Sequence, residues 1–172
     1  MVLSDSENRC WLTNGHEFLV INPEKKINKK LVFNELSGQM GWQVSMVEIR
    51  KGVFIIGCDK GLFEYDEKIN KLTSLDEINK EKTIANSPMY YDKMTNQLFL
   101  SANWWSEFYA LKQENSVWKI RKKIKLPFSV YAIRPSRNKL KLWLCTNKGL
   151  ALFDLQKLDY QLLTEENGLP DN

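Results

Sequence analysis

The stretch KLKLWLCTNKGLALFDLQKLDYQLLTEENGLPDN, from Lys139 to Asn172, decides the fold. Apolar and polar residues alternate along it, and the alternation is interrupted at Asn147-Lys148-Gly149 and again near Asp154. A period of two residues broken by Asn, Asp and Gly is typical of short antiparallel strands joined by tight turns. The C-terminal stretch therefore predicts a small antiparallel sheet.

The same pattern occurs three more times upstream, at a nearly constant spacing. Gly61 and Gly149 follow corresponding turns and are 88 residues apart, which is two steps of 44. The residues that end the third strand of each unit are 44, 46 and 42 apart, and they are Asn22, Asp66, Lys112 and Asp154. Repeats of about 40 to 50 residues with four short strands each are typical of β-propeller blades. A β-sandwich or barrel also consists of short strands, but we would not expect it to keep a constant period.

We therefore predict an all-β protein, with residues 1–172 forming a single segment of an incomplete β-propeller. Each of its four blades is expected to be a four-stranded antiparallel sheet. The first blade keeps only the short segment 1–5 where its first strand belongs, and its fourth strand is expected over 30–33. Ser74–Glu81 is the one segment predicted to form a helical turn or two. The predicted blades are 1–42, 43–86, 87–128 and 129–172.

Composition indicates a folded domain and excludes several classes of protein. The chain has 172 residues, of which 43% are hydrophobic and 12% aromatic, so it can bury a core. It contains no apolar run of roughly 18 residues that would span a membrane, and Met1–Asp5 meets charge too early for a secretory signal. The net charge of +4 comes with no nucleic-acid motif, so we expect no nucleic-acid partner and no membrane contact within this segment.

The residues that would carry catalysis or bind a metal are sparse. His16 is the only histidine, and a single histidine beside a turn is usually solvated rather than catalytic. The cysteines Cys10, Cys58 and Cys145 are dispersed through strand-like segments, where we expect them to be core residues. Glu165-Glu166 suits a polar turn better than a calcium site. We predict no enzyme activity, no metal and no cofactor.

The last unit resembles the two-component regulator propeller repeat, which reads roughly apolar-Trp-apolar-Gly-Thr-x-x-Gly-Leu, then Phe-Asp, and ends Gly-Leu-Pro-x-Asn. Leu142–Leu150 matches with Cys145 in place of the usual Gly, and Phe153-Asp154 and Gly168–Asn172 match as well. The second unit keeps Ile55–Leu62 but lacks the Trp and the Gly-Leu-Pro ending. The resemblance is strong in one unit and loose in the other three.

This resemblance implies a ligand-sensing segment of a periplasmic hybrid two-component sensor. In that family a membrane segment and a histidine kinase module lie outside the propeller, and the ligand is typically derived from a glycan. The implied function is signal transduction and transcription regulation, with periplasmic localisation. The alternative is a propeller that serves as a protein–protein scaffold, and for it a cytoplasmic location stays open.

Aromatic residues in the loops that join the second and third strands, and in those between blades, suggest where a ligand would bind. Aromatic faces suit the apolar C–H surfaces of sugar rings. The opposing interpretation is that these rings fill the space between adjacent blades. For Trp42 and Tyr90 both interpretations stay open. The predicted ligand-binding residues are Trp42, Tyr90, Trp104, Trp105 and Phe128.

An open array of blades also exposes a sheet face at each end. We therefore predict that the chain self-associates, end to end, through its terminal blades.

Overall fold

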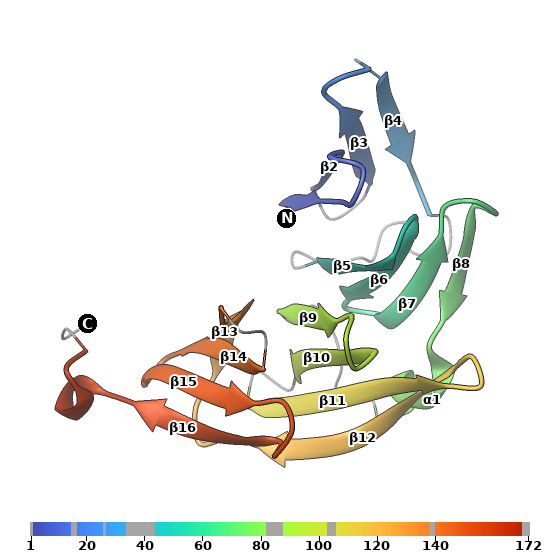
Figure 1. Ribbon diagram of the computed structural model, residues 1–172. Coiled ribbons are helices and arrows are strands. Elements are labelled where there is room, and N and C mark those ends of the chain that lie inside the picture. The colour runs from blue at the N-terminus through green and yellow to red at the C-terminus, as the bar shows by residue number, and fades with distance from the viewer. Residues whose placement is uncertain are drawn as a thin grey trace. The chain divides into compact units, whose positions relative to one another are not determined.

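The structure, a computed structural model, describes residues 2–14, 17–25, 27–33, 44–81, 88–102, 106–137 and 140–169. Within these ranges the strands form four four-stranded antiparallel sheets (Figure 1). Sheet 1 contains β1 (Val2–Ser4), β2 (Cys10–Thr13), β3 (Phe18–Asn22) and β4 (Ile27–Leu31). Sheet 2 contains β5 (Ser45–Arg50), β6 (Val53–Cys58), β7 (Gly61–Asp66) and β8 (Lys71–Ser74). Sheet 3 contains β9 (Met89–Asp92), β10 (Gln97–Ala102), β11 (Glu107–Glu114) and β12 (Val117–Lys125). Sheet 4 contains β13 (Val130–Pro135), β14 (Lys141–Thr146), β15 (Gly149–Asp154) and β16 (Asp159–Leu163).

In every sheet, strands that follow each other in the chain are neighbours in the sheet. This simple meander is the topology of a propeller blade, and the predicted all-β fold class is confirmed. The predicted helical patch contains α1 (Asp76–Asn79), which follows β8. A short 3-10 helix, η2 (Glu165–Asn167), follows β16 in the same way.

Side chains at the ends of third strands build the following turns. Asn22 Oδ1 accepts hydrogen bonds from the backbone N–H groups of Glu24 and Lys25, and Asp154 Oδ1 does the same for Gln156 and Lys157. In sheet 3 the corresponding residue is Lys112, which has no acceptor oxygen. There the strand continues to Glu114 and turns at two residues with positive φ, Asn115 at 49° and Ser116 at 64°. Positive φ at both central residues is the geometry of a two-residue hairpin turn.

One predicted strand needed correction. The sequence pattern placed the fourth strand of the first unit over 30–33, but β4 runs from Ile27 to Leu31. The Asn22 turn is tight, so pairing resumes at once, with Ile27 opposite Asn22. The exposed lysines of β4 also made the strand hard to recognise in the sequence, because a polar edge strand shows only a weak alternation of apolar and polar residues.

The glycine of the Asn-Lys-Gly turn is required by both conformation and space. Gly149 has a φ of 115°, and a Cβ there would collide with the backbone carbonyl oxygen of Leu163. Gly168 has a φ of 90°, but a Cβ there would meet no atom within 4 Å. A substitution at Gly149 therefore incurs both backbone strain and a steric clash, whereas a substitution at Gly168 incurs backbone strain alone.

We expect Gly149→Ala to lower the free energy of unfolding by at least about 2 kcal/mol, because a strain of about 1–2 kcal/mol is joined by a backbone clash. Gly168→Ala should cost only the strain, about 1–2 kcal/mol. Urea denaturation of both variants measures the difference. Equal losses would show that the contact between Gly149 and Leu163 does not constrain this turn.

The backbone contacts divide the chain into two compact units. The first comprises the described parts of 1–87 together with 114–118, the tip of the β11–β12 hairpin. The second comprises the described parts of 88–113 and 119–172. The prediction that 1–172 is one domain with blade boundaries at 42, 86 and 128 stays a prediction.

Each unit has its own core, formed where one face of a sheet packs on a face of the next. The first core lies between sheets 1 and 2 and contains Trp11, Phe18, Val20, Leu31, Phe33, Met46, Phe54, Ile56, Cys58 and Tyr65. The second core lies between sheets 3 and 4 and contains Phe99, Phe108, Ala110, Leu126, Phe128, Val130, Ile133, Leu142, Leu144, Ala151, Phe153 and Leu155.

The expectation that all three cysteines are core residues holds for Cys58 alone. Cys58 is buried, Cys10 is partly exposed and Cys145 is exposed. The reason is the two-residue period of a strand: Leu142 and Leu144 of β14 enter the second core, so Cys145 points to the opposite face.

Candidate functional site

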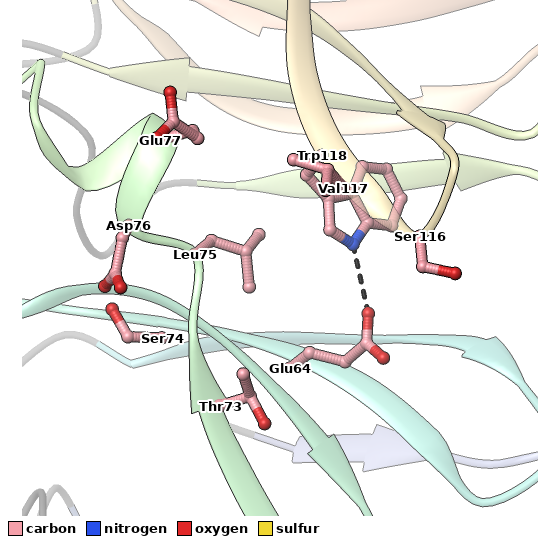
Figure 2. A pocket seen from close by; sticks show the side chains of 9 residues that line it. All are labelled: Glu64, Thr73, Ser74, Leu75, Asp76, Glu77, Ser116, Val117 and Trp118. Carbon is pink, nitrogen blue, oxygen red and sulfur yellow. Dashed lines mark hydrogen bonds between the residues drawn. The ribbon is translucent and has the colours of Figure 1, made fainter.

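The first unit contains a pocket of about 340 Å³ between its second sheet and the tip of the β11–β12 hairpin (Figure 2). This volume is at the small end of the range for ligand pockets, about 300–1,000 Å³. Its walls combine carboxylates, hydroxyls and apolar groups. The lining residues are Glu64, Thr73, Ser74, Leu75, Asp76, Glu77, Ser116, Val117 and Trp118.

Local hydrogen bonds fix the wall that α1 contributes. The backbone N–H of Leu75 donates to the carbonyl of Leu62 at 3.0 Å. The Asn79 side chain then holds Leu62 from both sides: its Oδ1 accepts from the Leu62 N–H at 2.8 Å, and its Nδ2 donates to the Leu62 carbonyl at 2.9 Å. These bonds tie α1 to the start of β7, so the residues of its first turn are held at the pocket.

A hydrogen bond joins the two walls. Figure 2 shows the indole nitrogen of Trp118 directed at Glu64, and Nε1 donates to Oε2 at 3.0 Å. The other carboxylate oxygen of Glu64 lies 3.7 Å from the guanidinium of Arg50. Trp118 is only 5% exposed, so its ring forms the base of the pocket rather than a free platform.

The pocket is rich in hydrogen-bond acceptors. Asp76 and Glu77 are exposed at its rim, and Lys80 Nζ lies 2.6 Å from Glu77 Oε1. Val117 is 43% exposed and supplies an apolar patch. Such a lining suits a ligand that donates hydrogen bonds and has an apolar face, and it disfavours an anion.

A second polar cluster in the first unit is built around a buried carboxylate. The side chain of Asp5 is fully buried and accepts four hydrogen bonds: from the N–H groups of Glu7 and Arg9, both at 2.9 Å, from Arg9 Nε at 2.7 Å and from Trp11 Nε1 at 2.8 Å. The two terminal nitrogens of the Arg9 guanidinium donate two further hydrogen bonds, of 2.9 and 2.7 Å, to the carboxylate of Glu67. The cluster thus links sheet 1 to the turn after β7.

The hydrogen bonds outweigh burial in setting the ionisation of this carboxylate. Burial acts to raise the pKa of Asp5, but the bonds from Trp11, Arg9 and Glu7 together hold that pKa below its ordinary value of 3.8. The Arg9 pKa is raised, chiefly by its hydrogen bond to Glu67. Asp5 and Arg9 are therefore both charged near neutrality and already paired, which is typical of a structural ion-pair network.

The lowered pKa makes this contribution to stability depend on pH. Because the folded pKa of Asp5 lies below its unfolded value, the stabilisation is complete above pH 3.8 and is lost as the pH falls through the folded pKa. We expect the stability difference between the wild type and Asp5→Asn, measured by urea denaturation, to be constant above about pH 5 and to shrink below pH 3.8. A difference that does not change with pH would show that Asp5 is not ionised in the fold.

The structure describes two of the five residues predicted to bind ligand. Phe128 is only 3% exposed and belongs to the second core, where its ring packs edge-on against Tyr160 with centroids 5.1 Å apart. Tyr90 is partly buried on β9 against the same core, and burial raises its pKa. Trp42, Trp104 and Trp105 lie outside the described residues, as does His16.

Sequence reasoning missed both Trp118 and the Asp5 cluster. Trp118 and Glu64 are separated by 54 positions, and Arg9 and Glu67 by 58. The one available signal in the sequence was Trp118 itself, the single aromatic residue in the lysine-rich segment Val117–Lys125.

Among the described residues, no group of three or more His, Cys, Asp or Glu side chains is arranged to hold a metal ion. The helices within the described ranges are all too short or too polar to cross a membrane.

No family model and no curated protein matches the sequence. Solved structures do match the fold. The extracellular domain of BT4673 from B. thetaiotaomicron, described as a one-component system, is 14% identical, with a TM-score of 0.69 over 95% of this chain and 23% of its own. The extracellular domain of BT3049 from the same organism, described as a hybrid two-component system, is also 14% identical, with a TM-score of 0.66 over 100% of this chain and 22% of its own.

The β-propeller domain of Cps50 (Swd1) from Myceliophteria thermophila matches as well, at 9% identity with a TM-score of 0.69 over 95% of this chain and 57% of its own. The chain thus spans less than a quarter of the length of the two solved extracellular domains from B. thetaiotaomicron that it resembles. At such low identities the matches show the fold: the four sheets are the blades of part of a propeller.

Proposed function

We propose that this chain is a non-catalytic, ligand-sensing propeller segment of a periplasmic two-component sensor. The observation that supports the proposal best is the fold similarity to extracellular domains of one- and two-component systems over at least 95% of the chain. The repeat motifs of the last unit support the same function from the sequence. The kinase module and the membrane anchor belong to the parent protein, outside this segment.

The proposed ligand is an oligosaccharide derived from a glycan. Its hydroxyl groups would donate to Glu64 and Asp76, which line the pocket of the first unit with the hydroxyl groups of neighbouring residues. The apolar C–H face of a sugar ring would lie against Val117, whose side chain is 43% exposed. A volume of about 340 Å³ suits one or two sugar units at the end of a longer chain.

The aromatic residues predicted from the sequence offer a second location. Trp104 and Trp105 stay proposed ligand contacts, because they replace the short turn that other blades have at this point. Phe128 is not proposed as a direct ligand contact, since its ring is buried in the second core. The two locations involve different residues, so different substitutions test them.

Tryptophan fluorescence of the intact chain during titration with a panel of glycan oligosaccharides tests the proposal. We expect a saturable change with at least one sugar. If the pocket holds it, Glu64→Gln together with Asp76→Asn should weaken binding by about tenfold or more, since each loses a charged acceptor worth about 1.5–3 kcal/mol. Asp159→Asn, an exposed carboxylate in the second unit, is the matched control and should leave binding unchanged.

The double variant Trp104→Ala/Trp105→Ala distinguishes the second location. Loss of binding in this variant alone would place the sugar at the predicted aromatic residues. A saturable change that no variant alters would contradict both proposed locations, and no change with any sugar would contradict the oligosaccharide proposal.

A further inference from the structure

The β11–β12 hairpin carries a charge equal to the net charge of the whole protein. Between Glu107 and Lys125 the sequence has six Lys and Arg residues and two Glu residues, so the formal charge of the hairpin is +4. The chain has 25 basic and 21 acidic residues, which is also +4, so the charges outside the hairpin balance. Five of the six basic residues of the hairpin lie in β12, within the segment 119–125. A basic run this dense is a candidate surface for a polyanion.

Strand alternation sorts these charges onto the two faces of β12. Ile124 is half-buried and packs against the second core. Lys122 lies on the same face, and its Nζ donates to the carbonyl of Leu158 at 2.9 Å. Four exposed basic residues occupy the opposite face, and we call them the basic stripe: Lys119, Arg121, Lys123 and Lys125.

The basic stripe has a regular spacing along the edge of its sheet. Residues two apart in a strand are separated by about 6.7 Å, so its four positions extend over about 20 Å. Lys123 is held in place, with its Nζ 3.2 Å from Glu107 Oε2 and 5.2 Å from the centroid of the Tyr109 ring. β12 is the edge strand of sheet 3, and in the chain sheet 3 has sheet 2 before it and sheet 4 after it. The stripe therefore belongs to an interior sheet of the chain.

The composition of β12 distinguishes between classes of polyanion. Lysines along an edge strand discourage the addition of a further strand, so we do not expect an acidic protein segment to extend the sheet. Sites for single-stranded nucleic acid combine positive charge with aromatic rings on which the bases stack. Trp118 is the single aromatic residue of β12, and it is only 5% exposed. The stripe thus suits an extended polymer that carries charges along its length and needs no stacking partner.

We propose that the basic stripe binds an anionic polysaccharide, through carboxylate or sulfate groups spaced along the polymer. This choice of polymer rests on the proposed glycan-sensing function. The stripe complements the pocket of the first unit, whose carboxylates, among them Glu64 and Asp76, disfavour an anion. The pocket takes the hydroxyl groups of a sugar, and the stripe takes the negative charges of a glycan chain.

Fluorescence anisotropy of labelled polymers, titrated with the intact chain, tests the proposal. Dextran sulfate carries sulfate groups and polygalacturonate carries carboxylates, so the two probes distinguish the sources of charge. We expect saturable binding of at least one of them, and binding should weaken as sodium chloride is raised, because salt screens exposed charges. The triple variant Lys119→Gln/Arg121→Gln/Lys125→Gln should raise the dissociation constant about tenfold or more, because three exposed ion pairs with the polymer are lost.

The matched control is Lys68→Gln/Lys93→Gln/Lys148→Gln, which removes the same charge from exposed lysines in three separate turns. It should bind the polymers like the wild type. Far-ultraviolet circular dichroism checks that both triple variants fold, and Lys119→Gln/Arg121→Gln replaces the first if it does not. Equal weakening by the two triple variants would overturn the stripe as a site. So would absence of binding to both polymers, or tighter binding to polythymidylate or to phosphatidylglycerol vesicles.

Failure of this inference and failure of the proposed function are distinguishable. Glu64→Gln together with Asp76→Asn, which tests the pocket with neutral oligosaccharides, should not weaken the binding of either polymer. Binding of a neutral oligosaccharide without binding of either polymer would overturn the stripe alone. Binding of a polymer that the stripe variant weakens, without binding of any neutral oligosaccharide, would support the stripe and contradict the oligosaccharide proposal for the pocket.

Discussion

Replacing Asp5 by alanine is expected to lower the free energy of unfolding by about 3–5 kcal/mol, the usual cost of removing one partner from a buried ion pair. The carboxylate accepts four hydrogen bonds at 2.7 to 2.9 Å. Without it, the indole N–H of Trp11 loses the acceptor of its hydrogen bond, in a residue that is 0% exposed. Arg9, whose side chain is 14% exposed, would keep Glu67 but lose the charge on its other side.

Urea denaturation followed by tryptophan fluorescence measures this loss. Asp5→Asn is the informative companion, because its amide oxygen still accepts but its charge is gone, so the loss should be intermediate. The control is Asp159→Ala, an exposed carboxylate that should cost less than about 0.5 kcal/mol. If Asp5→Ala costs no more than that control, the cluster does not stabilise the contact between sheets 1 and 2.

The second large effect is expected at Phe128. Phe128→Ala should lower the free energy of unfolding by about 3–5 kcal/mol, because truncating a buried aromatic residue removes its apolar surface and leaves a cavity. Phe128 is 3% exposed and packs in the second core beside Tyr160. The segment before it is held as well, since the Leu126 N–H donates to the Ser106 carbonyl at 2.7 Å, so the backbone cannot easily close the cavity.

Phe128→Leu should recover much of that stability, since it refills most of the volume. Met94→Ala, at a side chain 73% exposed in a turn of the same unit, is the control and should be nearly neutral. Thermal or urea denaturation distinguishes the variants. If Phe128→Ala lowers the free energy of unfolding by less than about 1 kcal/mol, the ring does not fill the core. Phe128 would then again be a candidate for direct contact with a ligand.

The fold could be predicted because its determinants are local and repeated. Alternation with a period of two placed the strands around Leu142–Thr146 and Gly149–Asp154, and the 44-residue spacing indicated blades rather than a sandwich. The turns could be predicted for the same reason, because their residues are local in sequence: Gly149 adopts the positive φ that its Asn-Lys-Gly context predicted. Lys112 broke the pattern, and β11 is longer as a consequence.

The candidate site could not be predicted, because it depends on contacts between distant segments. Glu64 and Trp118 come from different repeats, and the pocket forms only because the tip of the β11–β12 hairpin belongs to the first unit. The same holds for Arg9 and Glu67. Aromatic content alone predicted Phe128 as a ligand contact, but it gave no means to tell a core ring from a surface ring.

Isothermal titration calorimetry of the purified chain with glycan oligosaccharides tests the central claim most directly, because heat of binding needs no assumption about the site. The account predicts a saturable one-to-one isotherm with at least one oligosaccharide and no turnover of that sugar during the titration. Absence of heat with every sugar, or hydrolysis of the sugar by the chain, would contradict a non-catalytic, carbohydrate-sensing propeller segment.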